Sequence, residues 1–307
     1  MIVDIILVGI ALCALVIGSY TDLQRREIPD WINYSLLSVA LGLRLMESLV
    51  YGDWYILLFG VIGAAIGYAV ACIFYYTGQW GGGDAKMLIA LGAAFGSYQP
   101  ILFNPNFMNQ IAWLMPFSGL IVQYNLFFLP ILIANIFVAG AIYGVCWSLW
   151  LGIRHRKAFV KQAKLLYHDS MQQKLRYALF LTAAIFIVIA ISAKFEETFV
   201  RMLIAGAAIM LVGVYYLQLA LKCIEKACMI QSMKVEDLTE GEWIAHDVMV
   251  KGKRICGPKD LGVSDEQIKK LKRLQVKAVI VKIGIPFLPA FLVGFIVTVI
   301  FGNLITF

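Results

Sequence analysis

Apolar residues fill this chain in long blocks, and polar residues gather in the stretches between the blocks. Each block has about 20 residues, which is the length of helix that crosses the hydrocarbon core of a bilayer. The pattern therefore predicts eight transmembrane helices. Their predicted ranges are 2–20, 31–50, 55–77, 85–103, 120–151, 176–194, 199–221 and 280–303. The first block is too long for a signal peptide and lacks a basic segment before it, so we expect it to remain as an anchor.

The composition agrees with a membrane protein. Of the 307 residues, 61% are hydrophobic and only 15% are charged, whereas a soluble domain of this size needs more charge to cover its surface. We expect an all-α polytopic membrane protein with a small α+β insert before the last helix. A membrane core would occupy residues 1–222 with seven spans, a cytoplasmic insert residues 223–277, and the last helix residues 278–307.

Basic residues predict the orientation, because Lys and Arg accumulate on the cytoplasmic side of membrane proteins. With the N-terminus outside the cell membrane, 23 of the 26 basic residues fall on the inner side. Only Arg44, Lys194 and Arg201 fall on the outer side. In this topology both Asp22 and Asp84 face the cytoplasm.

The net charge of +7 follows from the same bias. Because the cations lie in loops beside membrane spans, we expect anionic membrane lipids as their partners and no nucleic acid. A zinc site built from Cys223, Cys228, Cys256 and His246 is conceivable, but the spacing matches no usual set of ligands. We therefore predict no metal and no cofactor.

The insert carries two local signals of structure. The stretch around Val248–Val250 alternates as a β-strand does, and Ser264 with Gln267 forms a capping box that opens a helix to about Leu274. A structural or regulatory cap on the inner face explains this insert better than a second active site does.

Two acids at span ends are the strongest chemical signal. Asp22 ends the first block and Asp84 precedes the fourth, so two predicted spans lie between them and return the chain to the same membrane face. Carboxylates are costly to desolvate at a membrane edge. Two that lie close together cannot both ionise cheaply, so one keeps its proton while the other deprotonates a water molecule. An aspartic protease requires this division of roles.

The residues around the two acids have both functional and structural interpretations. Gly81, Gly82 and Gly83 allow unusual backbone angles and the close approach of an extended substrate, or they form a plain loop in which Asp84 caps the next helix. Lys86 biases the ionisation of Asp84, reaches a lipid phosphate, or only extends toward the head groups. Glu27 attracts a basic substrate segment or is simply solvated.

Small and polar residues inside the blocks predict helix packing. Gly63 and Gly67, and Gly92 and Gly96, have the GxxxG spacing that lets two membrane helices approach closely. These pairs are expected to bring the third and fourth spans together and to hold the loop of Asp84. Asn135 is expected to form a hydrogen bond between helices.

Several of these residues match motifs of one family. The run from Asp22 to Asp30 resembles the first-aspartate motif of prepilin and preflagellin (archaellin) peptidases, and the run from Gly81 to Lys86 resembles their GxGD motif. Residues 285–289 (IPFLP) also resemble a late helix of that family. The compact N-terminal half is similar to archaeal members.

This resemblance implies a membrane aspartic endopeptidase with Asp22 and Asp84 as its catalytic pair. Its substrates would be prepilin-like or archaellin-like precursors, from which it removes short basic leader peptides at the cytoplasmic membrane face. Three alternatives stay open. One is a presenilin-like or signal-peptide-peptidase-like intramembrane protease, although Tyr20 is not adjacent to Asp22 as that motif requires. The others are a transporter with acids at the membrane edge and a structural assembly protein.

Overall fold

The computed structural model describes residues 2–98, 120, 123–192, 198–250 and 252–302. Most of these residues are helical, and a small part is β-sheet. The chain forms two compact units, one from residues 1–145 and 284–307 and the other from residues 146–283. The predicted domain limits at residues 222 and 277 stay predictions.

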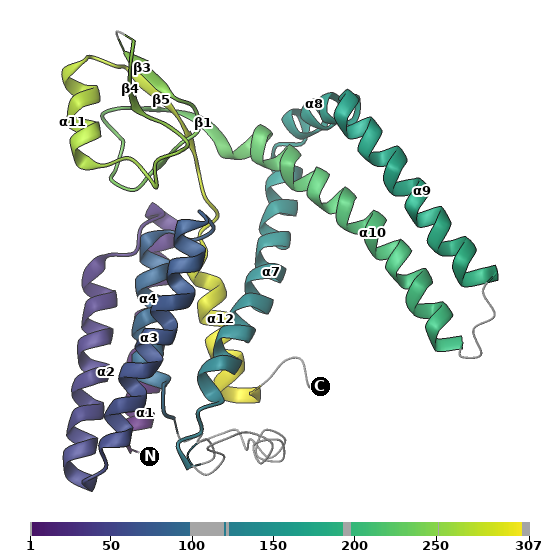
Figure 1. Cartoon of the computed structure of the whole chain (residues 1–307). Helices are drawn as coiled ribbons and strands as arrows, with labels where there is room; N and C mark the ends of the chain where they lie inside the picture. Colours follow the sequence, from purple (N-terminus) through teal and green to yellow (C-terminus); the bar gives the residue numbers. More distant parts are fainter. Residues whose placement is uncertain (1, 99–119, 121–122, 193–197, 251, 303–307) are drawn as a thin grey trace. The chain divides into compact units, whose positions relative to one another are not determined.

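The first unit is a helical bundle. Figure 1 shows four successive helices side by side, together with the last helix (yellow). The helices of this unit are α1 (Ile2–Arg25), α2 (Asp30–Tyr51), α3 (Trp54–Tyr76), α4 (Gly82–Phe95), the first part of α7 (Phe128–Arg154) and α12 (Leu288–Phe301). The last helix of the chain, α12, therefore belongs to the same unit as the first helix, α1.

Glycines bring α3 and α4 into close contact, as predicted. A side chain on Gly63 would overlap the carbonyl group of Gly92, and one on Gly92 would overlap the carbonyl group of Gly63. Gly96 lies equally close to the backbone of Phe59. The expected role of the GxxxG pairs in packing is confirmed, because only glycine leaves room for this approach.

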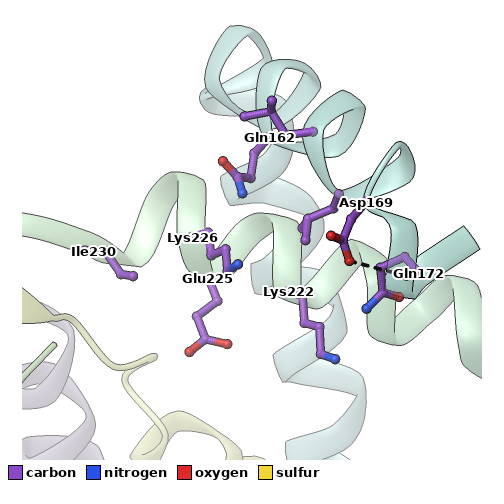
Figure 2. A pocket seen from close by; sticks show the side chains of 9 residues that line it. Gln162, Asp169, Gln172, Lys222, Glu225, Lys226 and Ile230 are labelled. Atoms are coloured by element: carbon purple, nitrogen blue, oxygen red, sulfur yellow. Dashed lines mark hydrogen bonds between the residues drawn. The ribbon is translucent and has the colours of Figure 1, made fainter. Parts of the chain in front are cut away.

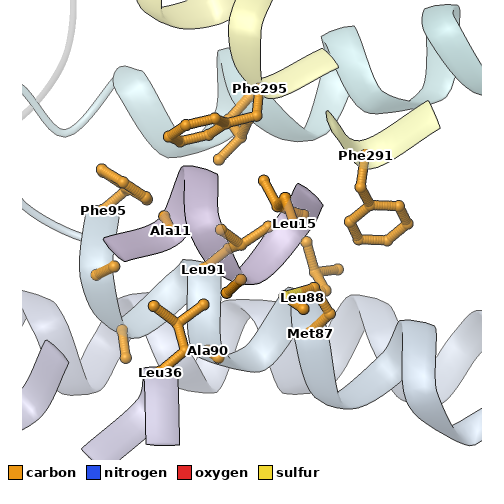
Figure 3. Packing of buried hydrophobic residues seen from close by; sticks show 14 of the residues in the cluster. Ala11, Leu15, Leu36, Met87, Leu88, Ala90, Leu91, Phe95, Phe291 and Phe295 are labelled. Carbon is orange, nitrogen blue, oxygen red and sulfur yellow. The ribbon is translucent and has the colours of Figure 1, made fainter. Parts of the chain in front are cut away.

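The core of the bundle consists of buried apolar side chains from α1, α2, α4, α7 and α12, some of which Figure 3 shows. Leu15 of α1, Leu36 of α2 and Leu88 of α4 all lie in this core, and the tilted rings of Phe95 and of Phe295 on α12 have centroids 5.3 Å apart. This packing fixes α4 and α12 relative to α1, and these three helices supply the candidate site described below.

Asn135 connects two helices of this unit. Its side-chain amide on α7 donates a hydrogen bond to the hydroxyl group of Thr298 on α12 at 3.0 Å, and both residues are fully buried. The predicted interhelical hydrogen bond is therefore confirmed.

A buried ionic cluster lies on the same helices. Arg44 forms ion pairs with Asp4 at 3.0 Å and with Glu47 at 2.9 Å, and all three side chains are buried. The guanidinium group also donates to the carbonyl groups of Ala94, at 2.8 Å, and Ser97. Arg44 thus caps the end of α4, where carbonyl groups lack helical partners.

The second unit combines long helices with a small sheet domain. Its helices are α8 (Arg156–Tyr167), α9 (Ser170–Ser192) and α10 (Thr198–Ile224), followed by the π-helical turn η1 (Glu225–Met229) and, within the sheet domain, α11 (Asp265–Arg273). Its strands are β1 (Ile230–Lys234), β2 (Trp243–Ile244), β3 (Val248–Val250), β4 (Lys253–Cys256) and β5 (Ala278–Lys282). An antiparallel sheet has the order β1-β5-β2, and β3 pairs with β4.

The local predictions for the insert are confirmed. Val248–Val250 is a strand, and the Ser264 hydroxyl accepts a hydrogen bond from the Gln267 N–H at 3.3 Å. In return the Gln267 side chain accepts one from the Ser264 N–H at 2.9 Å, which completes the capping box of α11. Ile268 and Leu271 of this helix lie in the apolar core of the domain.

The predicted count of eight spans is not confirmed. In the part of the chain that the structure describes, five helices are long and apolar enough to cross a membrane: α1, α3, α7, α9 and the stretch Thr198–Met229. Helix α2 carries Arg44 and Glu47, while α4 and α12 have only 14 residues each. Several membrane-length helices indicate a multi-pass membrane protein.

The predicted start of the last span is wrong. Residues 278–282 form β5, and α12 begins only at Leu288. Val279 and Val281 alternate with exposed residues and fill the core of the sheet domain. A short run of β-branched apolar residues fits a buried strand as well as it fits a helix, so hydropathy alone extended the span too far.

Candidate active site

Asp22 lies in the last turn of α1 and is only 7% exposed. Its Oδ2 accepts a hydrogen bond from the backbone N–H of Leu288 at 3.0 Å, and the backbone of Phe287 is a second donor. These two residues begin α12, where the first N–H groups have no helical partner. The negative charge of Asp22 is destabilised by the dipole at the C-terminal end of α1, where the residue lies. It is stabilised by the positive dipole end at the start of α12. The hydrogen bond therefore gives the Asp22 carboxylate a donor and the free N–H of Leu288 an acceptor.

Arg26 also faces Asp22. It follows α1 with φ +59°, a left-handed conformation that costs free energy for any residue except glycine. Its guanidinium group donates to the carbonyl group of Gly284, and its charge acts on Asp22. Tyr143 of α7 lies within electrostatic range of the same carboxylate. The strained backbone at residue 26 is thus compensated by contacts that the side chain makes around Asp22.

Asp84 lies in the first turn of α4 and is 9% exposed. Its Oδ2 accepts a hydrogen bond from the Gly81 N–H at 3.3 Å, so it does cap the helix, as one interpretation of the sequence expected. Its Oδ1 is buried and has no hydrogen-bond partner among the described residues. Capping uses one oxygen and leaves the other for chemistry.

The structure brings the two acids together. Asp22 is among the groups whose charge acts on Asp84. The turn that carries Asp84 also packs on the segment that follows α1, since Gly83 contacts Ile28 and its carbonyl group accepts from the Asn33 side chain at 3.4 Å. The two carboxyl groups, 62 positions apart in the sequence, are thus within electrostatic range of each other, and their role as a catalytic pair stays a prediction.

The three glycines do not have the unusual backbone angles that one interpretation of the sequence expected, while the close approach of a substrate to them stays a prediction. Gly82 and Gly83 are already in α4, Gly81 is extended at φ −75°, and none of the three has a positive φ. The expectation of unusual backbone angles is therefore wrong. A Cβ atom on Gly83 would lie 2.8 Å from Ile28, whereas Gly81 and Gly82 have no neighbour within 3.6 Å of that position. Close packing requires glycine only at position 83.

Trp80 anchors the start of this turn. The residue is 4% exposed, and its ring lies 4.7 Å from that of Phe74, 5.7 Å from Phe137 and 5.3 Å from Phe291. The rings come from α3, α7 and α12, so an aromatic cluster holds the residue just before Gly81 in place.

The two other predicted site residues lie at the surface of this region. Lys86 forms an ion pair with Asp30 at 2.6 Å and lies over the ring of Tyr34. This partner was not predicted for it. Glu27 is exposed, between Arg26 and the start of α2.

Residues 9–145 match the sequence profile of the type IV leader peptidase family. Over this stretch the chain is similar to that family. Asp22 and Asp84 both lie in the matched region.

Curated relatives point the same way. The chain is 28% identical over 141 residues to a prepilin peptidase of Methanothermobacter thermautotrophicus, a match that covers 45% of this chain and 36% of the relative. It is 29% identical over 119 residues to a preflagellin peptidase of Methanococcus maripaludis (38% and 51%). It is 28% identical over 133 residues to one of Methanocaldococcus jannaschii (43% and 56%). The chain thus spans between a third and a little over half of the length of these relatives. No solved structure matches it.

Sequence reasoning missed the groups that hold Asp22. Leu288 and Phe287 act through their backbone, and they lie outside the matched residues 9–145. The only signal was the run 285–289, in which Pro286 and Pro289 bracket the start of α12. Proline near a helix start marks where free N–H groups begin.

The second unit offers a weaker candidate. A hollow of about 570 Å³ lies among α8, α9 and α10 (Figure 2), with polar lining residues Gln162, Asp169, Gln172, Lys222, Glu225 and Lys226. Asp169 accepts a hydrogen bond from the Gln172 N–H at 3.3 Å, and Glu225 pairs with Lys282 at 2.6 Å. Both acids that line this hollow, Asp169 and Glu225, are thus already bound to neighbouring residues. Within the described ranges, no three His, Cys, Asp or Glu side chains gather as metal ligands.

Proposed function

We propose that this protein is a membrane-embedded aspartic endopeptidase. It removes short basic leader peptides from prepilin-like or preflagellin-like precursors at the cytoplasmic membrane face. The observation that carries the proposal is a pair of buried, interacting carboxyl groups, Asp22 and Asp84, within the part of the chain that is similar to the type IV leader peptidase family.

The chemistry follows from the pair. One carboxylate takes a proton from water, so that the oxygen attacks the scissile carbonyl carbon. The other, protonated, carboxyl group donates to the carbonyl oxygen. Collapse of the tetrahedral intermediate breaks the C–N bond, and the first acid returns its proton to the leaving amine. Two adjacent acids in a site largely shielded from water suit this sequence of proton transfers.

The surroundings of the pair suit a precursor with a basic leader followed by an apolar segment. Both acids lie at helix ends, at the edge of the apolar bundle. Glu27 and Asp30 provide negative charge beside them, and Lys86 holds Asp30 in place. In the proposed orientation this edge faces the cytoplasm, where the leader of a precursor is accessible to cleavage.

A cleavage assay tests the proposal. The purified protein in lipid nanodiscs is incubated with a prepilin-like precursor that carries a basic leader, and the masses of the products are measured. Asp22→Asn and Asp84→Asn are each expected to reduce cleavage by about a thousandfold or more, because each removes one proton-transfer group.

Glu47→Gln is the matched control. It makes the same change in a buried carboxyl group of the same bundle that lies outside the candidate site, and it is expected to cleave normally once folded. Elution as a single species in gel filtration checks the folding of each variant. Normal processing by both Asn variants would falsify the aspartic mechanism.

A further inference from the structure

The two acids of the candidate site differ in the donors that reach them. The N–H of Leu288 is 3.0 Å from Asp22, the backbone of Phe287 is a second donor, and Arg26 adds a positive charge. Asp84 accepts one longer hydrogen bond, 3.3 Å from the Gly81 N–H. Among the described residues its buried Oδ1 has no partner.

This difference selects a charge state for each acid. Donors that point at a carboxylate stabilise its ionised form. A buried oxygen without a donor is costly, most of all when it carries charge. The start of α4 favours negative charge at Asp84, but among the described residues only the Gly81 N–H reaches that group. Ionising it would also place a second negative charge beside Asp22.

We propose that Asp22 is the ionised acid and therefore the general base, that Asp84 is the protonated acid, and that the backbone N–H of Leu288 sets this difference. The assignment rests on the proposed function. Within the part of the chain that the structure describes, the charged and titratable groups that act on Asp22 besides Asp84 are Arg26, just after α1, and Tyr143 of α7. Leu288 is a positioning residue, because it acts through Asp22 and touches no reacting atom.

The reaction then has a defined direction. Asp22 takes the proton from water as the oxygen–carbon bond forms, and Asp84 gives its proton to the carbonyl oxygen. When the C–N bond breaks, Asp22 passes its proton to the leaving nitrogen. Asp84 recovers a proton from the hydroxyl group as the new carboxyl group forms. Both acids end in their starting states, and the balance is the addition of one water molecule.

Infrared spectroscopy of the resting protein tests the assignment without any substrate. A protonated carboxyl group gives a C=O stretching band that shifts in deuterium oxide. At neutral pH this band is expected in the wild-type protein. In Asp22→Asn the burial of Asp84 is unchanged but the repulsion from Asp22 is gone, so the band is expected to remain and to be lost at a lower pH than in the wild type. It is expected to be lost in Asp84→Asn. Glu47→Gln is the control for the ionic cluster of Arg44, and it should leave the band intact.

Two outcomes would overturn the assignment. Loss of the band in Asp22→Asn with retention in Asp84→Asn would reverse the roles. A band that is absent from the wild-type protein, or unchanged in both Asn variants, would mean that Asp84 is not the protonated member.

A second experiment tests the role of Leu288. Replacing its backbone amide with an ester, by incorporation of the α-hydroxy analogue of leucine, removes the N–H and keeps the side chain. This N–H lies at the start of α12, so no helical hydrogen bond is lost. The acidic limb of the kcat/KM profile is expected to move to higher pH by about one unit. Leucine inserted by the same route is the control, and an unchanged limb would exclude Leu288 as the positioning group.

The two levels of the proposal can fail separately. If the infrared bands follow the expectation and the wild-type protein cleaves no leader peptide, the charge assignment stands and the peptidase proposal fails. If cleavage requires both acids and the bands do not follow the expectation, the peptidase proposal stands and the assignment fails.

Discussion

The helical bundle buries carboxyl groups in two regions, and the two are built in opposite ways. Asp4 and Glu47 surround Arg44, which also binds the carbonyl groups at the end of α4. The charge of Asp22 acts on Asp84, and one Asp84 oxygen has no partner among the described residues. Helix α1 carries an acid of each kind, Asp4 and Asp22, about 27 Å apart at 1.5 Å per residue.

The contrast distinguishes the structural acids around Arg44 from the acids of the proposed site. A buried charge that is paired and hydrogen-bonded fixes the geometry of the helices around it. A buried acid that faces another acid and lacks a full set of donors costs free energy, and such a cost is typical of functional sites. The completeness of the partners distinguishes the two regions better than burial does, because all four acids are at most 9% exposed.

The largest effect on stability is expected from Arg44→Met. The change leaves Asp4 and Glu47 buried without a counter-charge and removes the donor to the end of α4. We expect the free energy of unfolding to fall by about 3–5 kcal/mol. Thermal unfolding of the protein in nanodiscs measures it.

A combined variant sharpens this test. Adding Asp4→Asn and Glu47→Gln to Arg44→Met removes the unpaired charges and should recover much of the loss. Asp84→Asn, in the other region, should not lower the unfolding temperature. An Arg44→Met protein as stable as the wild type would show that the two regions do not differ in the way described.

A smaller effect is expected from Gly83→Ala. The added methyl group would lie 2.8 Å from Ile28 and push the start of α4, and with it Asp84, away from the end of α1. We expect a loss of about 1–3 kcal/mol in stability and a clear loss of cleavage. Gly82→Ala is the matched control, because its methyl group meets no atom closer than 3.9 Å. Equal behaviour of the two variants would contradict the packing at position 83.

The smallest effect is expected from Lys86→Met. The ion pair with Asp30 is more than a third exposed at both side chains, and pairs of this kind contribute about 0–1 kcal/mol. The variant should keep its fold and cleave leader peptides, with a KM that falls modestly as the positive charge of the leader increases, because Asp30 loses its cationic partner. Complete loss of cleavage would place Lys86 in the chemistry itself.

The sequence predicted the two acids and most helices for a simple physical reason. A membrane requires long apolar segments, and their boundaries place Asp22 and Asp84 at span ends. It did not predict the partner of Arg44, because 40 positions separate it from Asp4. Nor did it predict the donor from Leu288, since a backbone N–H has no residue identity. The strand β5 was mistaken for helix because its valines are apolar in either state.

The position of Leu288 has a practical consequence for shortened forms of this protein. The family match ends at residue 145, yet a hydrogen bond to Asp22 comes from the opposite end of the polypeptide. A fragment trimmed to the matched region would retain both acids and lack this donor. Any attempt to isolate a minimal peptidase should therefore reconnect the final helix to the first four rather than discard it.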